Sequence, residues 1–342
     1  GAGWPGSRFA RTARDERAAA CAGVRLIMQW AIPVVAAVVA AFAIRLRLRF
    51  AASALDVPGH RSLHERPTPH GGGVGIVAAI LLLGWWLAIP AQWLLGVAVL
   101  AALSWVDDHH PLPFWLRLPV HLLVAGGVVF LQVDALTWGA FIMAGLIAWS
   151  INAYNFMDGA DGLAGSMAVA GFGAYAVAFA LAQQPTWAIF CCVIVAASVV
   201  FLCFNWHPAQ IFMGDIGSIP LGFLAGGLGW LGVELQCWPA WFPLMAFAPF
   251  WLDASVTLVR RLCRGERVWE AHREHYYQRM VRSGLTHAQM TRRWAGLMGA
   301  GGGLAGGLLL QPAFQTVGLM AWSLVLLWFG LRLDRQWENK NK

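Results

Sequence analysis

Residues 187–204 read WAIFCCVIVAASVVFLCF, and this stretch decides the fold. It carries no charged side chain and approaches the roughly 20 apolar residues that a membrane-spanning helix needs. Backbone N–H and C=O groups that face lipid must pair within their own segment, so the stretch is predicted to be a helix. Its cysteines, which form no CxxC pair, are interpreted as small buried hydrophobic side chains rather than as zinc ligands or disulfide partners.

Comparable apolar stretches recur along nearly the whole chain. Of the 342 residues, 59% are hydrophobic and only 12% are charged, against about 25% charged in a soluble domain. The sequence therefore predicts an all-α fold, a polytopic transmembrane helix bundle of about eleven spanning helices that forms one domain. The predicted helices cover residues 26–44, 74–89, 91–106, 118–133, 136–151, 163–182, 187–204, 219–233, 239–259, 295–311 and 313–331.

Basic residues indicate how this bundle is oriented. After residue 44, Lys and Arg occur in 45–73, at Arg117, in 260–294 and in the C-terminal tail. With eleven helices, all of these places fall on one side of the membrane, and the positive-inside rule makes that side cytoplasmic. The net charge of +7 is therefore mainly a signal of topology. Because the basic residues stand beside membrane helices, a nucleic-acid partner is disfavoured.

The first 27 residues break the pattern. Their arginines would lie outside, and the segment has no apolar core that would make it a signal peptide. We therefore expect translation to begin at Met28 and residues 1–27 to be a non-native extension. The expected organisation is then a single transmembrane domain over 28–331 and a cytoplasmic tail over 332–342.

Carboxylates gather at the predicted cytoplasmic end. Charged groups at the middle of a spanning helix cost roughly 2.5–3.5 kcal/mol, and placement at helix ends avoids much of that cost. Clustered carboxylates repel each other unless a cation or a pKa shift relieves them, and Mg²⁺ commonly joins one or two carboxylates to substrate phosphates. The cluster therefore favours phosphoryl chemistry over independent solvated loop charges. Its members are Asp107, Asp108, Asp158, Asp161, Asp215 and Asp253.

Two glycine-rich loops run into predicted helices at the same end. Residues 67–73 read PTPHGGG and residues 214–218 read GDIGS. Glycines before a helix N-terminus present backbone N–H groups and the positive end of the helix dipole to an anion. Glycine also simply makes turns, so these loops support a phosphate site without establishing one.

Taken in order, these motifs resemble one family. The Asp107-Asp108 pair, residues 152–163 (NAYNFMDGADGL) and residues 205–218 (NWHPAQIFMGDIGS) are similar to the polyprenyl-phosphate N-acetylhexosamine-1-phosphate transferases, of the glycosyltransferase family 4 type. The first and last cytoplasmic loops of that family are matched by residues 61–73 (RSLHERPTPHGGG) and 272–278 (HREHYYQ). The resemblance is closer to the branch that begins O-antigen and related surface polysaccharides. The muramoyl-pentapeptide branch usually has a three-histidine run where this chain has His272 and His275.

The resemblance implies a reaction and a location. A UDP-N-acetylhexosamine would give its sugar-1-phosphate to undecaprenyl phosphate and release UMP. The implied cofactor is Mg²⁺, with Mn²⁺ as a substitute, and positioning with the metal would supply most of the catalysis. The implied place is the bacterial inner membrane, with catalytic loops and the C-terminus on the cytoplasmic face. The identity of the sugar, a direct or covalent route and a homodimer stay open.

It also implies roles for individual residues. Asp215 would be the principal Mg²⁺ ligand, Asp108 would join it, and Asp107 would act on the lipid phosphate or the metal. His272 and His275 would meet the pyrophosphate or the sugar, and Phe212 would stack on uracil. The substrate-binding residues implied are Asn152, Asn155, Asp158, Asp161, Asn205, Phe212, Arg117 and Arg273.

Two further implications concern charge. The family often has a lysine shortly after the Asp-Asp pair, and here Arg117 or His109 would take over that charge. Asp253 is expected to orient an arginine.

Other interpretations remain open at this stage. A transporter or flippase for lipid-linked sugars would place its polar groups near the membrane midplane and often shows repeated halves, whereas no repeat is found here. A phosphatase acting on polyprenyl pyrophosphate would share the metal chemistry but needs no nucleotide pocket. His121 is interpreted as a core residue that makes a hydrogen bond. Gly299, Gly303 and Gly307 are interpreted as a helix-packing face.

Overall fold

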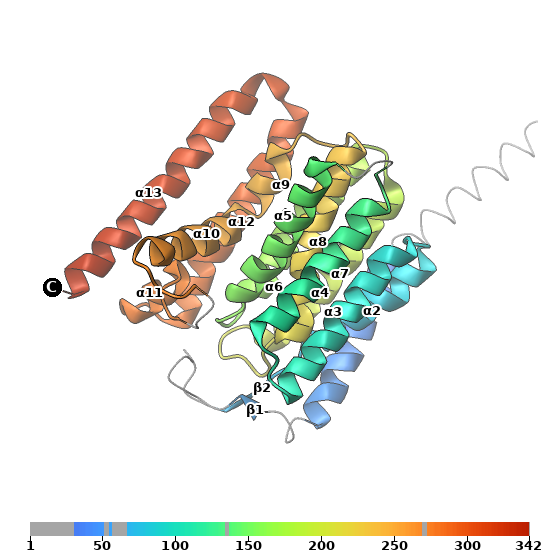
Figure 1. The fold of residues 1–342 in the computed structure, drawn as a ribbon, viewed down its shortest axis with the longest axis horizontal. Helices are drawn as coiled ribbons and strands as arrows, with labels where there is room; N and C mark the ends of the chain where they lie inside the picture. Colours follow the sequence, from blue (N-terminus) through green and yellow to red (C-terminus); the bar gives the residue numbers. More distant parts are fainter. Residues whose placement is uncertain (1–30, 51–54, 57–66, 134–136, 269–271, 342) are drawn as a thin grey trace, which may run out of the picture.

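The computed structural model describes residues 31–50, 55–56, 67–133, 137–268 and 272–341. These segments are almost entirely helical, as the sequence predicts (Figure 1). Besides the helices and the loops between them, they contain a small antiparallel ribbon, β1 (Leu55–Asp56) with β2 (Thr68–Pro69), in which Leu55 pairs with Pro69. The proposed extension 1–27 lies outside the described residues.

The first part of the chain forms a bundle of helices in the predicted places. A helix over Ala31–Arg49 precedes it. The bundle then consists of α2 (Val74–Trp86), α3 (Ala91–His109), α4 (Phe114–Phe130), α5 (Trp138–Phe156), α6 (Leu163–Leu181), α7 (Pro185–Asn205) and α8 (Asp215–Glu234).

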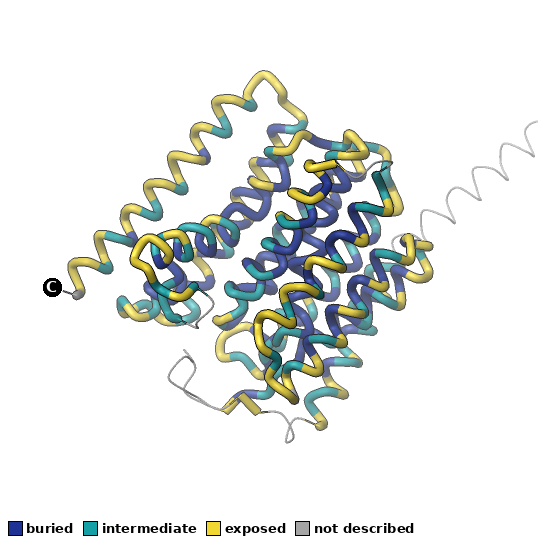
Figure 2. The backbone as a smooth tube through the Cα atoms, viewed as in Figure 1, coloured by how far each residue is buried: buried dark blue, intermediate teal, exposed yellow. Residues whose placement is uncertain are grey.

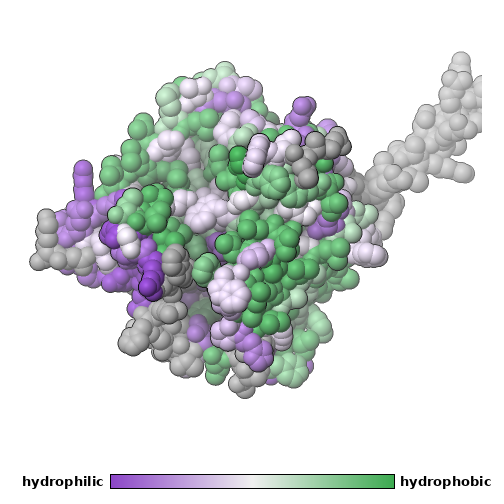
Figure 3. All heavy atoms as spheres, in the orientation of Figure 1, coloured by the Kyte–Doolittle hydropathy of each residue, from purple (hydrophilic) through white to green (hydrophobic). Residues whose placement is uncertain are grey.

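The bundle is built as a membrane protein. Among the described residues, five helices are long and apolar enough to cross a membrane, and α2 and α4 are shorter apolar helices. Figure 3 shows apolar side chains over the outward faces of the long helices on the side in view, and hydrophilic ones gathered over the end that carries α11 (Tyr276–Arg282). An all-α membrane fold is therefore confirmed. The number of about eleven spans stays a prediction.

Helix α8 lies at the centre of the bundle. Of its apolar window, 89% is buried, and Figure 2 shows it enclosed by its neighbours. Glycines permit this close approach: a Cβ at Gly222 would stand 2.7 Å from Cα of Ile151 on α5. Small residues at such contacts let helix backbones pack closely in membranes. The packing fixes the N-terminal end of α8, where Asp215 lies.

The predicted single helix 239–259 is wrong. The chain forms a short α9 (Trp241–Ala246), breaks at Phe247, and continues as α10 (Ala248–Cys263). Pro249 lies in the first turn of α10, where its missing N–H is tolerated, whereas inside one continuous helix it would break a hydrogen bond. In Figure 1, α10 crosses at a marked angle to the long helices.

The C-terminal part also departs from the predicted bounds. Helix α12 (His287–Leu310) begins before the expected residue 295, because Thr286 and Gln289 form a reciprocal capping box at its start. After a short turn, η2 (Pro312–Phe314), the chain forms α13 (Gln315–Asn341). The predicted cytoplasmic tail 332–342 is helical as far as Asn341, because α13 continues through it; most of its described residues are exposed, but Leu333 is buried.

Candidate active site

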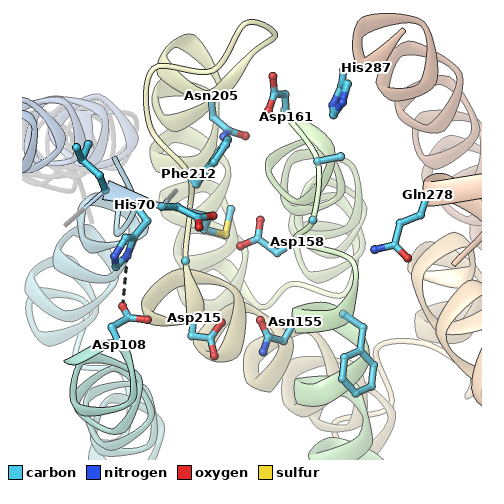
Figure 4. Close-up of a pocket in the computed structure, with 17 residues that line it drawn as sticks. His70, Asp108, Asn155, Asp158, Asp161, Asn205, Phe212, Asp215, Gln278 and His287 are labelled. Atoms are coloured by element: carbon cyan, nitrogen blue, oxygen red, sulfur yellow. Dashed lines mark ion pairs between the residues drawn. The ribbon is translucent and has the colours of Figure 1, made fainter. Parts of the chain in front are cut away.

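A polar cavity of about 690 Å³ lies at the end of the bundle where α5 and α7 end and α8 begins. Most of the residues that the sequence predicts for the site face it (Figure 4): Asp108, Asn155, Asp158, Asp161, Asn205, Phe212 and Asp215. Three residues that sequence reasoning missed also line it: His70, Gln278 and His287. The cavity thus joins segments that are far apart in the chain.

The two carboxylates of the Asp-Asp pair contact different partners, Arg117 and His70. Arg117 Nη1, on the first turn of α4, lies 2.7 Å from Asp107 Oδ2 and 3.6 Å from Asp215 Oδ2. Asp108 turns the other way, with its Oδ2 3.7 Å from His70 Nδ1. Arg117 therefore lies between Asp107 and Asp215. Nothing is described of the side chain of His109.

The two glycine-rich loops hold each other through their backbones. Gly72 N–H donates to the carbonyl of Phe212 at 2.8 Å, and Gly73 N–H donates to the carbonyl of Met213 at 2.9 Å. A Cβ at Gly73 would stand 2.3 Å from Cα of Gly217, so only glycine permits this approach. The starts of α2 and α8 therefore lie side by side, and the positive ends of the two helix dipoles favour an anion there.

Asn205 joins the two central motif loops. Its Oδ1 accepts from Gly162 N–H at 2.8 Å, and its Nδ2 donates to the carbonyl of Ile211 at 2.8 Å. Gly162 has a φ of 73°, a conformation that glycine adopts at little cost. The predicted substrate-binding role of Asn205 thus accompanies a structural one. Both loops are held at a fixed separation on one wall of the cavity.

Asp158 is a half-buried carboxylate that lines the cavity. Burial raises the pKa of its carboxyl well above the usual range, and the negative charge of Asp215 raises this pKa further. Figure 4 shows Asp108, Asp158 and Asp215 turned toward the same space. Crowded carboxylate oxygens of this kind suit a hard cation such as Mg²⁺, which would relieve their repulsion.

Asp161 lies among histidines. Its Oδ2 is 2.7 Å from His207 Nδ1 and accepts from Ala209 N–H at 3.2 Å. The rings of His207 and His287 stack with centroids 5.5 Å apart. His207 lies within the motif 205–218, but no spacing in the sequence sets it apart as a site residue. His287 is the first residue of α12, and the early start of that helix brings it to the cavity.

The predicted histidine pair stands beside the cavity. His275 is buried, and its Nδ1 lies 3.1 Å from Asp253 Oδ1. Asp253 also accepts from the N–H groups of Tyr276 at 2.9 Å and Tyr277 at 3.2 Å. The expectation that Asp253 orients an arginine is therefore wrong: it orients His275 and the start of α11.

His272 lies next to this pair, with its ring centroid 4.8 Å from that of His275. Burial, together with the nearby His275 and Arg261, lowers the pKa of His272 to about 4. Its imidazole is therefore neutral near pH 7. Gln278, on the first turn of α11, reaches the cavity itself.

Two predicted residues lie farther out. Asn152 is one turn before Asn155 on α5, where its Nδ2 donates to the carbonyl of Ala148 at 2.7 Å and lies 3.5 Å from His121 Nδ1. The carbonyl of Arg273 accepts from Arg282 Nη1 at 3.0 Å. Among the described residues that line the cavity, neither is found.

Comparison with known proteins gives consistent relatives. A family model described as glycosyl transferase family 4 matches residues 90–233. The chain is 27% identical over 264 residues, 70% of its length and 73% of the relative's, to a probable undecaprenyl-phosphate N-acetylglucosaminyl 1-phosphate transferase of Bacillus subtilis. It is 24% identical over 318 residues (83% and 84%) to an undecaprenyl-phosphate alpha-N-acetylglucosaminyl 1-phosphate transferase of Escherichia coli K12.

A phospho-N-acetylmuramoyl-pentapeptide-transferase of Lactobacillus helveticus is 27% identical over 259 residues, 65% of this chain and 78% of the relative's. Both branches of the resemblance are thus represented. The resemblance inferred from the motifs is confirmed.

Proposed function

We propose that this chain, which resembles glycosyl transferase family 4 across its central motifs, transfers N-acetylhexosamine-1-phosphate from a UDP-sugar to undecaprenyl phosphate. The observation that carries the proposal is the cavity that joins Asp108, Asp158 and Asp215 with Phe212. Carboxylates that can share a divalent cation and an aromatic ring that can stack on a base serve a nucleoside diphosphate donor. The product would be the first lipid-linked intermediate of a surface polysaccharide.

The reaction exchanges one phosphoanhydride for another. A phosphate oxygen of undecaprenyl phosphate forms a bond to the β-phosphorus of the donor. The bond from that phosphorus to the oxygen bridging to UMP breaks, and UMP leaves with the electron pair. Direct attack and a covalent intermediate on a carboxylate both satisfy this balance.

Asp215 and Asp108 are the proposed ligands of Mg²⁺, with Mn²⁺ as a substitute. The ion, when bound, would neutralise charge on the pyrophosphate. Support comes from the crowding of Asp108, Asp158 and Asp215 around one cavity and from the raised pKa of Asp158.

The acceptor phosphate is proposed to lie near Arg117 and Asp107. Arg117 bridges Asp107 and Asp215, so its guanidinium supplies positive charge at the edge of an acidic cluster. A lipid phosphate that reaches this edge would meet one fixed cation, and a guanidinium suits the oxygens of a phosphate.

The nucleotide is proposed to lie along the wall formed by the two central motif loops. Phe212 would stack on uracil, and Asn155, Asp158, Asp161 and Asn205 would line the pocket. Asn152 and Arg273 are proposed to act from outside this lining.

The sugar and pyrophosphate are proposed to meet the side of α11. His272 and His275 would act there, with Gln278 facing the cavity directly. The neutral imidazole of His272 would offer a hydrogen bond without adding charge.

The proposed location is the bacterial inner membrane, with the site and the C-terminus cytoplasmic. Arg260, Arg264, Arg279 and Arg282 surround the same end of the molecule, which agrees with the positive-inside rule. A homodimer is left to experiment.

The test is a donor panel on the purified protein in detergent. Undecaprenyl phosphate, Mg²⁺ and one UDP-sugar at a time are supplied, and UMP and lipid-linked product are followed. One donor giving both products, with loss on adding EDTA, supports the proposal and names the sugar. Folded protein that binds no uridine nucleotide and releases no UMP with any donor would contradict it and favour a transporter or flippase.

A further inference from the structure

We infer that Asp334 is a positioning residue that holds the segment carrying His272 and His275 against the cavity. It lies on the C-terminal extension of α13, which here means residues 332–341. The inference rests on the proposed function for its kinetic consequences. The contacts that carry it are independent of that function.

Asp334 is the meeting point of three elements. Its two carboxylate oxygens accept from both terminal nitrogens of Arg260, on α10, at 2.7 Å each. The same carboxylate accepts from Arg279 Nη1 at 3.2 Å and from the hydroxyl of Tyr276 at 3.1 Å. Asp334 is 18% exposed and Arg279 is 10% exposed, whereas Arg260 is 40% exposed, so the inner part of the network is shielded from water and its outer edge is not.

The geometry distinguishes this network from an ordinary surface pair. Exposed ion pairs contribute little unless they are bidentate or part of a network, and this one is both. Burial and the charge of Asp334 raise the pKa of Tyr276 to about 12. The Tyr276 hydroxyl therefore stays protonated and remains a donor to Asp334 throughout the working pH range.

Further residues on the same face of the extension also contact α11. Trp337 lies three residues beyond Asp334, on the same helix face, and the guanidinium groups of Arg279 and Arg282 stand 5.7 and 4.7 Å from its ring centroid. Lys340, three residues on again, donates to the carbonyl of Arg282. The extension thus runs along α11 and contacts its last turn through Lys340.

The opposite side of α11 leads to the site. Asp253 holds His275 and the first backbone N–H groups of α11 from within. Gln278 on that helix lines the cavity. Because α11 has only seven residues, it holds its place through its neighbours. Asp253 fixes it from the core and Asp334 from the outside, so loss of either would shift His275 and Gln278.

This arrangement also accounts for the length of α13. Only 6% of the apolar window of the helix over Pro312–Lys340 is buried, and Figure 1 shows α13 standing apart from the bundle along most of its length. The extension is where α13 makes its charged contacts with α10 and α11. We call these contacts of residues 334–340 with α10 and α11 the brace, because they hold the segment beside the site from the outside of the bundle.

The test compares Asp334→Asn with Glu338→Gln, which removes an exposed carboxylate one turn further along the same helix. Asn keeps the size of the side chain and removes the charge. Hydrogen exchange of the backbone over 272–282 should rise at least about tenfold in Asp334→Asn, since local opening follows the loss of such contacts. Exchange in α8 should not change. Glu338→Gln should leave both segments as they are.

The kinetic measurement separates positioning from stability. In Asp334→Asn, kcat/KM for the UDP-sugar should fall about 10- to 100-fold, the size expected when reacting groups are misplaced by about 1 Å. The KM for undecaprenyl phosphate should stay as in the parent, because Arg117 is elsewhere. Asp334→Glu, which restores the charge, should recover part of the loss.

The exchange and kinetic results together decide whether Asp334 is a positioning residue. Faster exchange over 272–282 with unchanged kinetics would make the contact merely structural and overturn the inference, and so would unchanged exchange. The exchange measurement needs no turnover. A parent protein that is silent with every donor, together with faster exchange in Asp334→Asn, would support the brace while contradicting the proposed transfer reaction.

Discussion

The hydroxyl of Tyr277 lies directly over Gly159. It donates to the carbonyl of Phe156 at 3.2 Å, and a Cβ added at Gly159 would stand 2.0 Å from its oxygen. The side chain of Tyr277 is thus hydrogen-bonded to the backbone of Phe156, which lies 121 positions earlier in the chain. The contact holds the loop with Asp158 against the segment with His275, so two of the proposed functional regions share one fixed boundary.

Gly159→Ala should therefore reduce transfer by at least about tenfold, because the methyl group forces the two loops apart and small displacements at a reacting centre are costly. Tyr277→Phe removes the clashing oxygen and leaves the ring carbon 3.1 Å from the new methyl group. The double variant should be more active than Gly159→Ala alone. UMP release by the three purified variants checks this, and equal activity of the single and double variants would contradict it.

Arg117→Gln should raise the KM for undecaprenyl phosphate roughly tenfold, because a charge-assisted contact with the acceptor phosphate is lost. The KM for the UDP-sugar should change little. Arg117→Lys should retain much of the affinity, since it keeps the charge. Arg335→Gln, at an exposed position on α13, is the matched control. A selective rise in the donor KM instead would move Arg117 to the nucleotide side.

Asp253→Asn should destabilise the protein by about 1–3 kcal/mol, because buried donors lose their charged acceptor. Four groups contact this carboxylate: His275 Nδ1, the N–H groups of Tyr276 and Tyr277, and the hydroxyl of Thr257. Thr257→Val is the control, since Thr257 merely donates to the same carboxylate at 3.1 Å. Thermal unfolding in detergent measures both variants. Equal loss in the two would show that the carboxylate charge is unimportant.

Native cysteines allow a direct test of orientation. Cys263 is exposed at the end of α10, and Cys237 follows the opposite end of α8. In variants that keep one or the other, a membrane-impermeant maleimide added to intact cells should label Cys237 and spare Cys263. The reverse pattern would invert the proposed topology. Labelling of both after permeabilisation controls for access.

The sequence predicts the elements of the site better than their assembly. Asp108, Asp158 and Asp215 were placed together because charged groups avoid the middle of spanning helices, and the structure brings them to one cavity. The break at Phe247 could not be predicted from hydropathy, because residues 239–259 carry a single charged side chain, Asp253, and read as one apolar stretch. Pro249 was the available signal.

Contacts between distant residues account for most of the rest. Asp334 and Arg260 are separated by 74 positions, and no local pattern links them, so residues 332–342 were predicted only as a tail beyond the last spanning helix. Asp253 was expected to orient an arginine because the family resemblance implies that role. In the structure, the Asp253 carboxylate contacts the side chain of His275 instead. The early start of α12 had a local signal, the pair Thr286 and Gln289, and it brings His287 to the cavity.

The most direct test of the central claim follows the β-phosphorus of the donor. Purified protein is given undecaprenyl phosphate, Mg²⁺ and UDP-N-acetylglucosamine labelled with ³²P at that position, with Asp215→Asn as the control. We expect the label to move into the lipid fraction as UMP is released, and to stay with the nucleotide in Asp215→Asn. Sugar appearing on lipid while the label remains in UDP would mean transfer of the sugar without its phosphate, and would contradict the account.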